Sequence, residues 1–377
     1  MTRHLGQDKF RHDSIPAVGV LVANLGTPEA PTGQALRPYL KEFLSDPRVI
    51  EPPPARWLWW LILNGIILNT RPKRSARLYQ NIWTEGGSPL LKTSRLQVAE
   101  IAVALTERIG SPLHVALGMR YGRPSIASAL AELESKDCRR VLVLPLYPQY
   151  SGATTGSTFD AVADALKATR WVPELRFVNA YHDDPAYIAA LAASVREAWD
   201  EHGRPDRLMF SFHGIPRRYF LSGDPYHCQC QKTARLLAEA LELPEEERHV
   251  CFQSQFGKEP WLEPYTEQTF RAWAGLGLKR FDAICPGFSA DCLETLEEMN
   301  ITNREIYTAA GGGDYHYIPA LNTRPDHIAS LAGVIERNLV GWVGGTEEYD
   351  PVGQEAEANK RTELYRKLEG VSPNVST

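Results

Sequence analysis

Short apolar runs alternate with longer amphipathic segments along most of this chain. The runs are rich in Val, Ile, Leu and Phe and are bounded by polar or Gly- and Pro-containing turns, which is typical of buried strands. The runs that fit strands are Ala17–Leu25, Leu113–Met119, Val141–Leu146, Leu175–Ala180, Arg207–Phe212, His249–Gln253, Arg280–Cys285 and Glu305–Thr308. The segments that fit helices are Ser88–Ile109, Ser125–Glu134, Phe159–Ala168, Pro185–His202, Gln231–Leu241, Leu262–Ala274 and Asp291–Met299. This alternation indicates parallel sheets that are covered by helices on both faces.

The pattern divides near Tyr181–Pro185, where two aspartates and a proline interrupt the periodicity. A chain of 377 residues also exceeds the usual size of one domain. We therefore expect an α/β fold with two doubly wound domains, residues 15–181 and residues 182–322. A carboxyl-terminal helix at 323–341 and a loose polar tail at 342–377 complete the predicted organisation.

Composition narrows the class of protein. Hydrophobic residues make up 43% of the chain and charged residues 23%, which is ordinary for a globular protein. The net charge of −5 argues against a nucleic-acid partner. The segment Met1–Ile15 lacks the apolar stretch of a signal peptide, and Trp57–Leu68 is shorter than a membrane-spanning helix. These features predict a cytoplasmic protein.

Two short segments carry the candidate chemistry. His213 stands where the apolar run ending at Phe212 meets a Gly and Pro turn. Asp291, Glu294 and Glu298 follow the run that ends at Cys285, at spacings that place them on one face of an α-helix. Ligands of α/β proteins bind outside the carboxyl ends of strands, so the imidazole and the carboxylates can face one cleft. Such a group can accept protons or bind a divalent cation. A solvated acidic helix face and a histidine packed in a turn are the structural alternatives.

Several motifs in this order and spacing resemble the ferrochelatase family. They extend from Val20 to about Asn322, which is most of the chain. The matched segments are Val20–Pro28, Leu117–Gly122, Pro145–Ser151, Thr154–Ser157, Ser211–Gly214, Gln253–Gly257 and Cys285–Glu298. The resemblance implies a lyase of heme biosynthesis that inserts Fe²⁺ into protoporphyrin IX and releases two protons. It also implies two Rossmann-like domains with a porphyrin cleft between them.

The resemblance assigns roles to individual residues. His213 occupies the position of the family's histidine that accepts the pyrrole protons or holds the metal, and Glu294 matches its catalytic glutamate. Asp291 and Glu298 would extend an acidic path toward solvent. Expected porphyrin contacts are Leu25, Tyr121, Trp261 and Phe288 on the ring, and Tyr79, Ser88 and Arg120 on the carboxylate side. For the aromatic residues, ordinary core packing is the alternative.

The chain departs from relatives of this type at two places. Cys292 stands where many members carry a histidine, which leaves its role open. Some members hold a [2Fe–2S] cluster through carboxyl-terminal cysteines, whereas this chain has no cysteine after Cys292 and carries Gly152 at the position of a further ligand. We therefore expect no cofactor beyond the substrate Fe²⁺. A cluster held by Cys228, Cys230 and Cys251 is the alternative.

The apolar segment Trp57–Leu68 is followed by the basic segment Arg71–Arg77. This combination suits peripheral contact with the inner face of a membrane, a hydrophobic lip over the porphyrin cleft, or a helix packed in the core. Two other functions also fit the sequence. One is a chelatase for coproporphyrin III or for cobalt and sirohydrochlorin, and the other is a non-catalytic porphyrin or heme carrier.

Overall fold

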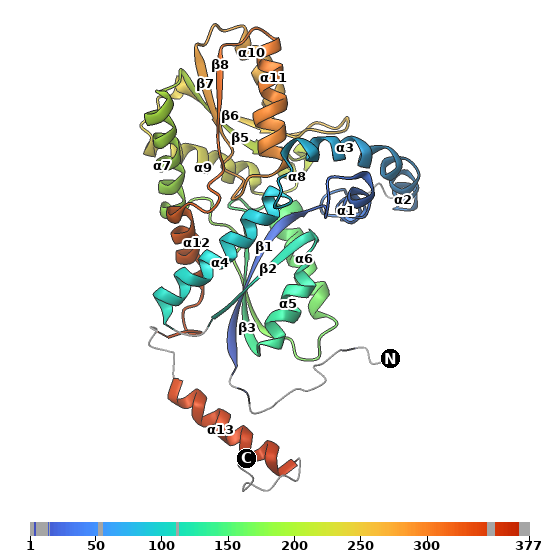
Figure 1. Cartoon of the computed structure of the whole chain (residues 1–377), viewed down its shortest axis with the longest axis vertical. Helices are drawn as coiled ribbons and strands as arrows, with labels where there is room; N and C mark the ends of the chain where they lie inside the picture. Colours follow the sequence, from blue (N-terminus) through green and yellow to red (C-terminus); the bar gives the residue numbers. More distant parts are fainter. Residues whose placement is uncertain are drawn as a thin grey trace.

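Two four-stranded parallel sheets form the centre of the protein in a computed structural model (Figure 1). The structure describes residues 4, 14, 16–51, 56–110, 113–344 and 351–368. The first sheet has the order β2-β1-β3-β4, with β1 at Ala17–Thr27, β2 at Leu113–Gly122, β3 at Cys138–Pro145 and β4 at Glu174–Phe177. The second has the order β6-β5-β7-β8, with β5 at Arg207–His213, β6 at Arg248–Gln253, β7 at Arg280–Ile284 and β8 at Asp314–Ile318. The predicted α/β class with parallel sheets is confirmed.

Helices cover both sheets. Those of the first half are α1 (Gly33–Ser45), α2 (Arg56–Ile62), the π-helix η1 (Leu63–Ile67), α3 (Leu68–Ile82), α4 (Pro89–Ile109), α5 (Ile126–Ser135), the π-helix η2 (Gly152–Gly156) and α6 (Ser157–Leu166). Those that follow are α7 (Pro185–His202), α8 (Arg217–Leu221), α9 (Tyr226–Ala240), the 3₁₀-helix η3 (Glu245–Glu247), α10 (Thr266–Ala274), the π-helix η4 (Leu293–Asn303), α11 (Arg304–Ala309), α12 (Pro325–Asn338) and α13 (Pro351–Leu368).

Successive apolar side chains of β1 pack on opposite faces of the first sheet, which explains why helices cover both faces. Val20 and Val22 belong to a core cluster shared with α4, α7 and α12, whereas Leu21 packs in a separate cluster with α5 and α6. Successive side chains of a strand point to opposite faces, so this continuous apolar run fills two cores at once.

The larger core cluster joins the two halves of the chain. It contains Leu142 and Leu144 of β3 together with Leu208 and Phe210 of β5, all of them fully buried. Helix α12 follows the second sheet in the sequence but packs against α4 and α7. The two sheets therefore share one continuous hydrophobic core, the apolar body of the molecule.

Two predicted elements differ in the structure. The segment Glu305–Thr308 was predicted as a strand because it contains Ile, Tyr and Thr, but it belongs to helix α11, which continues directly from η4. The fourth strand of that sheet is β8, beyond the glycines at 311–313. The polar tail expected at 342–377 contains α13, while residue 15 and residues 345–350 and 369–377 lie outside the described residues.

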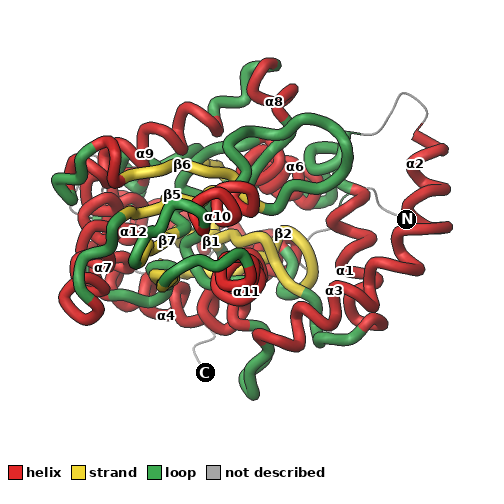
Figure 2. The backbone as a smooth tube through the Cα atoms, turned by 90° about the horizontal axis from the view of Figure 1, so that it is seen from above, coloured by secondary structure: helices red, strands yellow, loops and turns green. Residues whose placement is uncertain are grey.

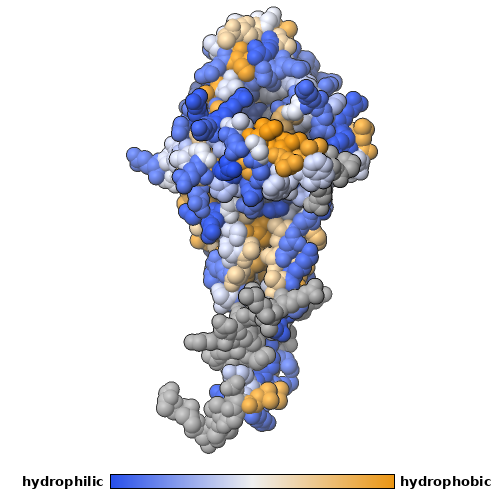
Figure 3. All heavy atoms as spheres, turned by 90° about the vertical axis from the view of Figure 1, so that its right-hand side faces the viewer, coloured by the Kyte–Doolittle hydropathy of each residue, from blue (hydrophilic) through white to orange (hydrophobic). Residues whose placement is uncertain are grey.

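The segment Trp57–Leu68 forms α2, η1 and the first residue of α3, and these elements project to one side of the body together with α1 (Figure 2). Trp57 is 66% exposed and Trp60 is 60% exposed, whereas Leu63 and Leu68 are buried in a core cluster, so the segment packs in the core along one face only. Apolar residues gather on this side of the molecule (Figure 3). Within the described residues, none of the helices combines the length and apolar character that crossing a bilayer requires.

Candidate active site

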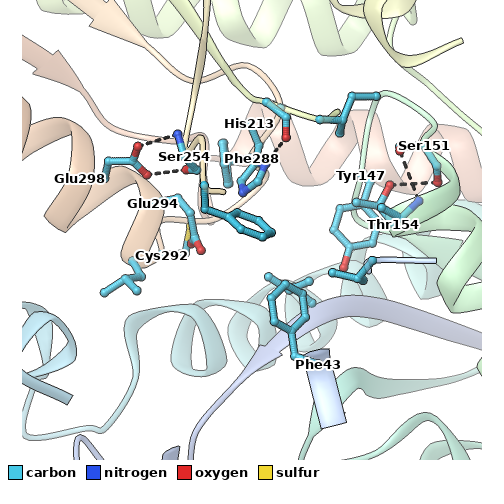
Figure 4. Close-up of a pocket in the computed structure, with 18 of the residues that line it drawn as sticks. Phe43, Tyr147, Ser151, Thr154, His213, Ser254, Phe288, Cys292, Glu294 and Glu298 are labelled. Atoms are coloured by element: carbon cyan, nitrogen blue, oxygen red, sulfur yellow. Dashed lines mark hydrogen bonds between the residues drawn. The ribbon is translucent and has the colours of Figure 1, made fainter. Parts of the chain in front are cut away.

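A cavity of about 550 Å³ lies where the carboxyl ends of both sheets meet (Figure 4). Leu25 at the end of β1 and Tyr147 after β3 line one side, and His213 at the end of β5 and Phe288 after β7 line the other. Carboxyl ends of parallel strands are the usual ligand sites of α/β proteins. Most of the lining is apolar, so the cavity suits a large, flat, hydrophobic ligand.

His213 is the last residue of β5, and its half-buried ring lines the cavity. Its Nδ1 lies 2.7 Å from the carbonyl oxygen of Gly214. Because a carbonyl oxygen can only accept a hydrogen bond, the neutral ring carries its proton on Nδ1. The lone pair is then on Nε2, and His213 can accept a proton from a ligand in the cavity.

Glu294 and Glu298 lie on η4, and both line the cavity. In a π-helix the i→i+5 hydrogen bonds widen the turn, so residues four apart stack along one face. The expectation that Asp291 shares this face is wrong because Asp291 precedes η4. Its carboxylate accepts hydrogen bonds from Tyr317 Oη at 2.8 Å, Thr295 Oγ1 at 2.9 Å and Asn322 Nδ2 at 2.8 Å, and it does not line the cavity.

The residues after β6 hold Glu298 in place. The Ser254 amide donates to Glu298 Oε1 at 2.7 Å, and the Ser254 hydroxyl donates to Oε2. Ser254 has a φ of 65°, a left-handed conformation that is uncommon for a residue with a side chain. Burial raises the pKa of Glu298, and the opposing effects of the Ser254 hydrogen bonds and of His213 only partly offset this. Ser254 lies in the matched segment Gln253–Gly257, but no pattern in the sequence indicates its role.

Gln253 links the same strand end to Glu294. Its Nε2 donates to the Glu294 carbonyl oxygen at 2.8 Å, and its Oε1 accepts from the Ser211 hydroxyl at 2.8 Å. Gln253 is also the partner of His213 in the ladder between β5 and β6. The hydrogen bond from Gln253 to Glu294 therefore links the strand that carries His213 to η4.

Cys292 caps the start of η4. Its Sγ accepts the backbone N–H of Thr295, and Thr295 Oγ1 accepts the Cys292 N–H at 2.9 Å. Burial raises the pKa of the Cys292 thiol well above its ordinary value. The geometry does not support the alternative of an iron–sulfur cluster held by Cys228, Cys230 and Cys251. Cys230 and Cys251 lie in different core clusters, and the described residues contain no group of three or more His, Cys, Asp or Glu residues that could hold a metal ion.

The expected porphyrin contacts separate into two groups. Leu25, Trp261 and Phe288 line the cavity. The others lie behind its wall: Tyr79, Ser88, Arg120 and Tyr121.

Arg120 already forms an ion pair with a carboxylate of the protein, that of Asp46. Its guanidinium lies 2.5 Å from Asp46 Oδ2 and also donates to Ser157 Oγ at 2.6 Å. The Tyr121 hydroxyl donates to the same aspartate at 2.8 Å. An arginine that is already paired with a buried carboxylate has its charge compensated. Arg120 and Tyr121 therefore stabilise the first half behind the cavity.

Two arginines that sequence analysis noted only as part of a basic stretch line the cavity instead. Arg71 and Arg74 extend from α3, and neither makes an ion pair with a described residue. Part of the Arg71 side chain is exposed to solvent at the opening of the cavity, and the rest lies against its walls. Enclosure by the surrounding walls, with repulsion from Arg74, lowers the pKa of its guanidinium. The cavity lining therefore carries two arginines from α3 and two carboxylates, Glu294 and Glu298, from η4.

A family profile and the curated relatives both match this chain over most of its length. A profile described as ferrochelatase matches residues 17–339. A ferrochelatase of Thioalkalivibrio sulfidiphilus is 58% identical over 353 residues, covering 94% of this chain and 95% of the relative. A ferrochelatase of Nitrosococcus oceani is 55% identical over 363 residues, covering 95% of this chain and 97% of the relative. Among solved structures, a cobalt-bound sirohydrochlorin chelatase of Bacillus subtilis subspecies spizizenii is 10% identical with a TM-score of 0.49, covering 85% of this chain and 95% of that chain.

Proposed function

This chain belongs to the ferrochelatase family, the lyases that insert iron into protoporphyrin in heme biosynthesis, and from this premise we propose how its cavity performs that reaction. Protoporphyrin IX lies in the cavity between the two sheets, with its ring against Leu25, Trp261 and Phe288. The observation that carries the proposal is that His213 and Glu294, from separate elements, line the same apolar cavity.

The reaction exchanges two pyrrole protons for one Fe²⁺, so the site needs a proton acceptor and a metal ligand. His213 offers the Nε2 lone pair to a pyrrole N–H, and a neutral imidazole is an effective general base near neutral pH. Glu294 supplies carboxylate oxygens to Fe²⁺ before transfer. The single Nε2 lone pair of His213 takes the two pyrrole protons one after the other, and the first proton passes to the carboxylates of η4 before the second is taken. No resident cofactor is needed, because the metal is the substrate.

The proton leaves along the acidic side of the cavity. Glu298 lies one π-helical turn beyond Glu294, and Ser254 fixes its carboxylate with two neutral donors. We assign Glu298 to proton transfer toward solvent. Asp291 orders the start of η4 through Thr295, so its contribution to the path is structural.

Contacts with the ring also contribute to catalysis. Phe288 and Trp261 extend into the cavity from the second half, and Leu25 approaches from the first half. Binding that bends the macrocycle exposes the pyrrole lone pairs to the metal, and interactions that are strongest in the bent state accelerate insertion.

The distribution of charge favours a porphyrin with two carboxylates. Arg71 and Arg74 are the Lys or Arg side chains among the described residues that line the cavity, and they match two propionates. Coproporphyrin III carries four propionates, so its two additional carboxylates would face the apolar wall or the carboxylates of η4. Burying an unpaired charge costs several kcal/mol.

We expect kcat/KM for protoporphyrin IX to exceed that for coproporphyrin III by at least about tenfold because of this cost. The measurement is anaerobic Fe²⁺ insertion with each porphyrin, followed by absorbance of the metallated product. Equal rates with both porphyrins would contradict the proposed specificity, and product formation only with cobalt and sirohydrochlorin would replace it. Binding without turnover would identify a carrier.

The projecting segment around α2 also supports peripheral contact with the inner face of the membrane. Trp57 and Trp60 are exposed on α2, and the chain continues into α3, where the basic residues Lys73 and Arg77 are also exposed. Aromatic and basic residues together favour the interface of an anionic bilayer. Helix α3, which continues from this segment, borders the cavity through Arg71 and Arg74. A membrane-bound porphyrin would therefore reach the site directly.

Replacing both tryptophans, Trp57→Ser and Trp60→Ser, is expected to lower the fraction of protein that sediments with phosphatidylglycerol vesicles by at least about fivefold. Activity with detergent-dispersed porphyrin is expected to stay within about twofold, because neither side chain lines the cavity. Leu276→Ser is the matched control, since Leu276 is 55% exposed on a different part of the surface. Unchanged sedimentation of the double variant would exclude this contact.

A further inference from the structure

We propose that Phe256 is a specificity-determining residue that holds the Arg71 guanidinium at the mouth of the cavity to receive a substrate carboxylate. This inference rests on the proposed function, which places the porphyrin carboxylates near Arg71 and Arg74. Phe256 was part of a matched motif, but neither the sequence pattern nor the catalytic chemistry gives it a role.

The contact joins the two sides of the cavity. Arg71 is on α3 in the first half, and Phe256 is on the loop that follows β6 in the second half. The Arg71 Cζ atom lies over the Phe256 ring, 5.6 Å from its centroid. Both side chains line the cavity, so their contact is at the place where a ligand would pass between these elements.

The Phe256 ring is itself supported by the site. It packs edge to face on Trp261 with ring centroids 4.8 Å apart, and the Trp261 ring is 6.4 Å from the ring of His213. The loop begins at Ser254, which is fixed by its two hydrogen bonds to Glu298. The position of Phe256 is therefore set by residues that also define the catalytic end of the cavity.

An aromatic partner suits an arginine that must remain available to an anion. A free arginine side chain loses rotamer entropy when a ligand orders it. A contact with a ring face restricts the side chain before the ligand binds, so part of this entropic cost is removed from the binding step. The ring accepts the charge but does not occupy the N–H donors in the guanidinium plane, so these donors stay free for a carboxylate. A glutamate here would instead neutralise the charge and compete with the substrate.

The exposure of Phe256 agrees with this role. Its side chain is 38% exposed, although Trp261 beneath it is 3% exposed. Gly257 follows in a left-handed conformation with a φ of 79°, which turns the chain away immediately after the ring. The outer part of the ring is therefore presented toward Arg71 and the opening and is not packed into the core.

The experiment compares a dicarboxylic porphyrin with its uncharged ester. Binding of deuteroporphyrin IX and of deuteroporphyrin IX dimethyl ester to the full chain is followed by quenching of protein fluorescence, in a common detergent. The ratio of the two dissociation constants reports how well the protein recognises the carboxylates. Thermal unfolding of each variant verifies that it folds.

Phe256→Leu is expected to lower the preference for the free acid by roughly threefold, which corresponds to the loss of one exposed cation–π contact, while affinity for the ester changes less. Phe256→Tyr retains the ring face and is expected to behave as the wild type. Phe159→Leu is the matched control, because Phe159 is 53% exposed on α6 and does not line the cavity.

Arg71→Gln separates this inference from the function on which it rests. If Arg71→Gln lowers the preference for the acid and Phe256→Leu does not, the role of Phe256 is refuted and the carboxylate site stands. If Arg71→Gln leaves the preference unchanged, the placement of the carboxylates is itself wrong, and the inference falls with it. In the double variant we expect no loss beyond that of Arg71→Gln, and additive losses would show that Phe256 acts independently of Arg71.

Discussion

His213→Ala is expected to lower kcat for Fe²⁺ insertion into protoporphyrin IX by at least about a hundredfold, the lower range of what a positioned general base contributes. The Nδ1 contact with the Gly214 carbonyl oxygen directs the lone pair of Nε2 away from the backbone, and alanine removes that acceptor. Porphyrin affinity is expected to change by less than about threefold, because the apolar walls remain. Anaerobic initial rates and fluorescence quenching measure the two quantities separately.

A matched histidine variant makes this result interpretable. His202→Ala removes an imidazole from the carboxyl-terminal end of α7, outside the cavity lining, and should retain full activity. Imidazole added to the buffer is expected to restore part of the rate of His213→Ala, since the cavity is open to solvent. A His213→Ala enzyme with an unchanged kcat would remove the proposed proton acceptor.

Glu294→Gln is expected to lower kcat/KM for Fe²⁺ by at least about a hundredfold, because an amide is a much weaker ligand for a divalent first-row metal than a carboxylate. The substitution preserves side-chain size, and the hydrogen bond from Gln253 is made to the backbone oxygen of residue 294, so η4 keeps its anchor. Initial rates over a range of Fe²⁺ concentrations at saturating porphyrin give this constant, and an effect confined to the porphyrin KM would contradict a role toward the metal.

Glu297→Gln is the control within the same helix. Glu297 also lines the cavity, but its carboxylate accepts a hydrogen bond from Thr302 Oγ1 at 3.1 Å, within the same helix. We expect a change of less than about fivefold. A loss as large as that of Glu294→Gln would mean that any neutralised carboxylate on η4 disables the enzyme, and the specific role of Glu294 would be lost.

The positions of His213 and Glu294 could be predicted because His213 ends the apolar run of β5 and Glu294 lies on the helix that follows the apolar run of β7. Apolar runs identify buried strands, and the parallel arrangement brings their carboxyl ends to one edge. The convergence of these two residues on one cavity therefore depended on local patterns and a single rule of topology. Eight strands were expected from such runs, and the one error, Glu305–Thr308, came from a short segment whose composition does not distinguish strand from helix.

Other features had no local signal. Spacing placed Glu294 and Glu298 on one helix face, and both line the cavity. The π-helix η4 has the sequence pattern of an ordinary amphipathic helix, so its start after Asp291 and the exclusion of Asp291 from that face could not be derived from spacing. The ion pair of Arg120 has no local signal either, because its partner Asp46 is 74 positions away and belongs to a segment without a recognised motif. Arg71 and Arg74 were passed over for a similar reason, since only the packing of α3 beside the cavity turns part of a basic stretch into its lining.

The apolar body shared by the two sheets has a consequence for how a ligand is admitted. A rotation of one half against the other would separate Leu142 and Leu144 from Phe210, and exposing such side chains costs on the order of 2 kcal/mol each. The frame that holds His213 and Glu294 thus resists such a rotation. Capture and release of the macrocycle are then left to exposed groups at the rim of the cavity, such as the Arg71 side chain, while the shared core holds the reactive groups at a constant distance.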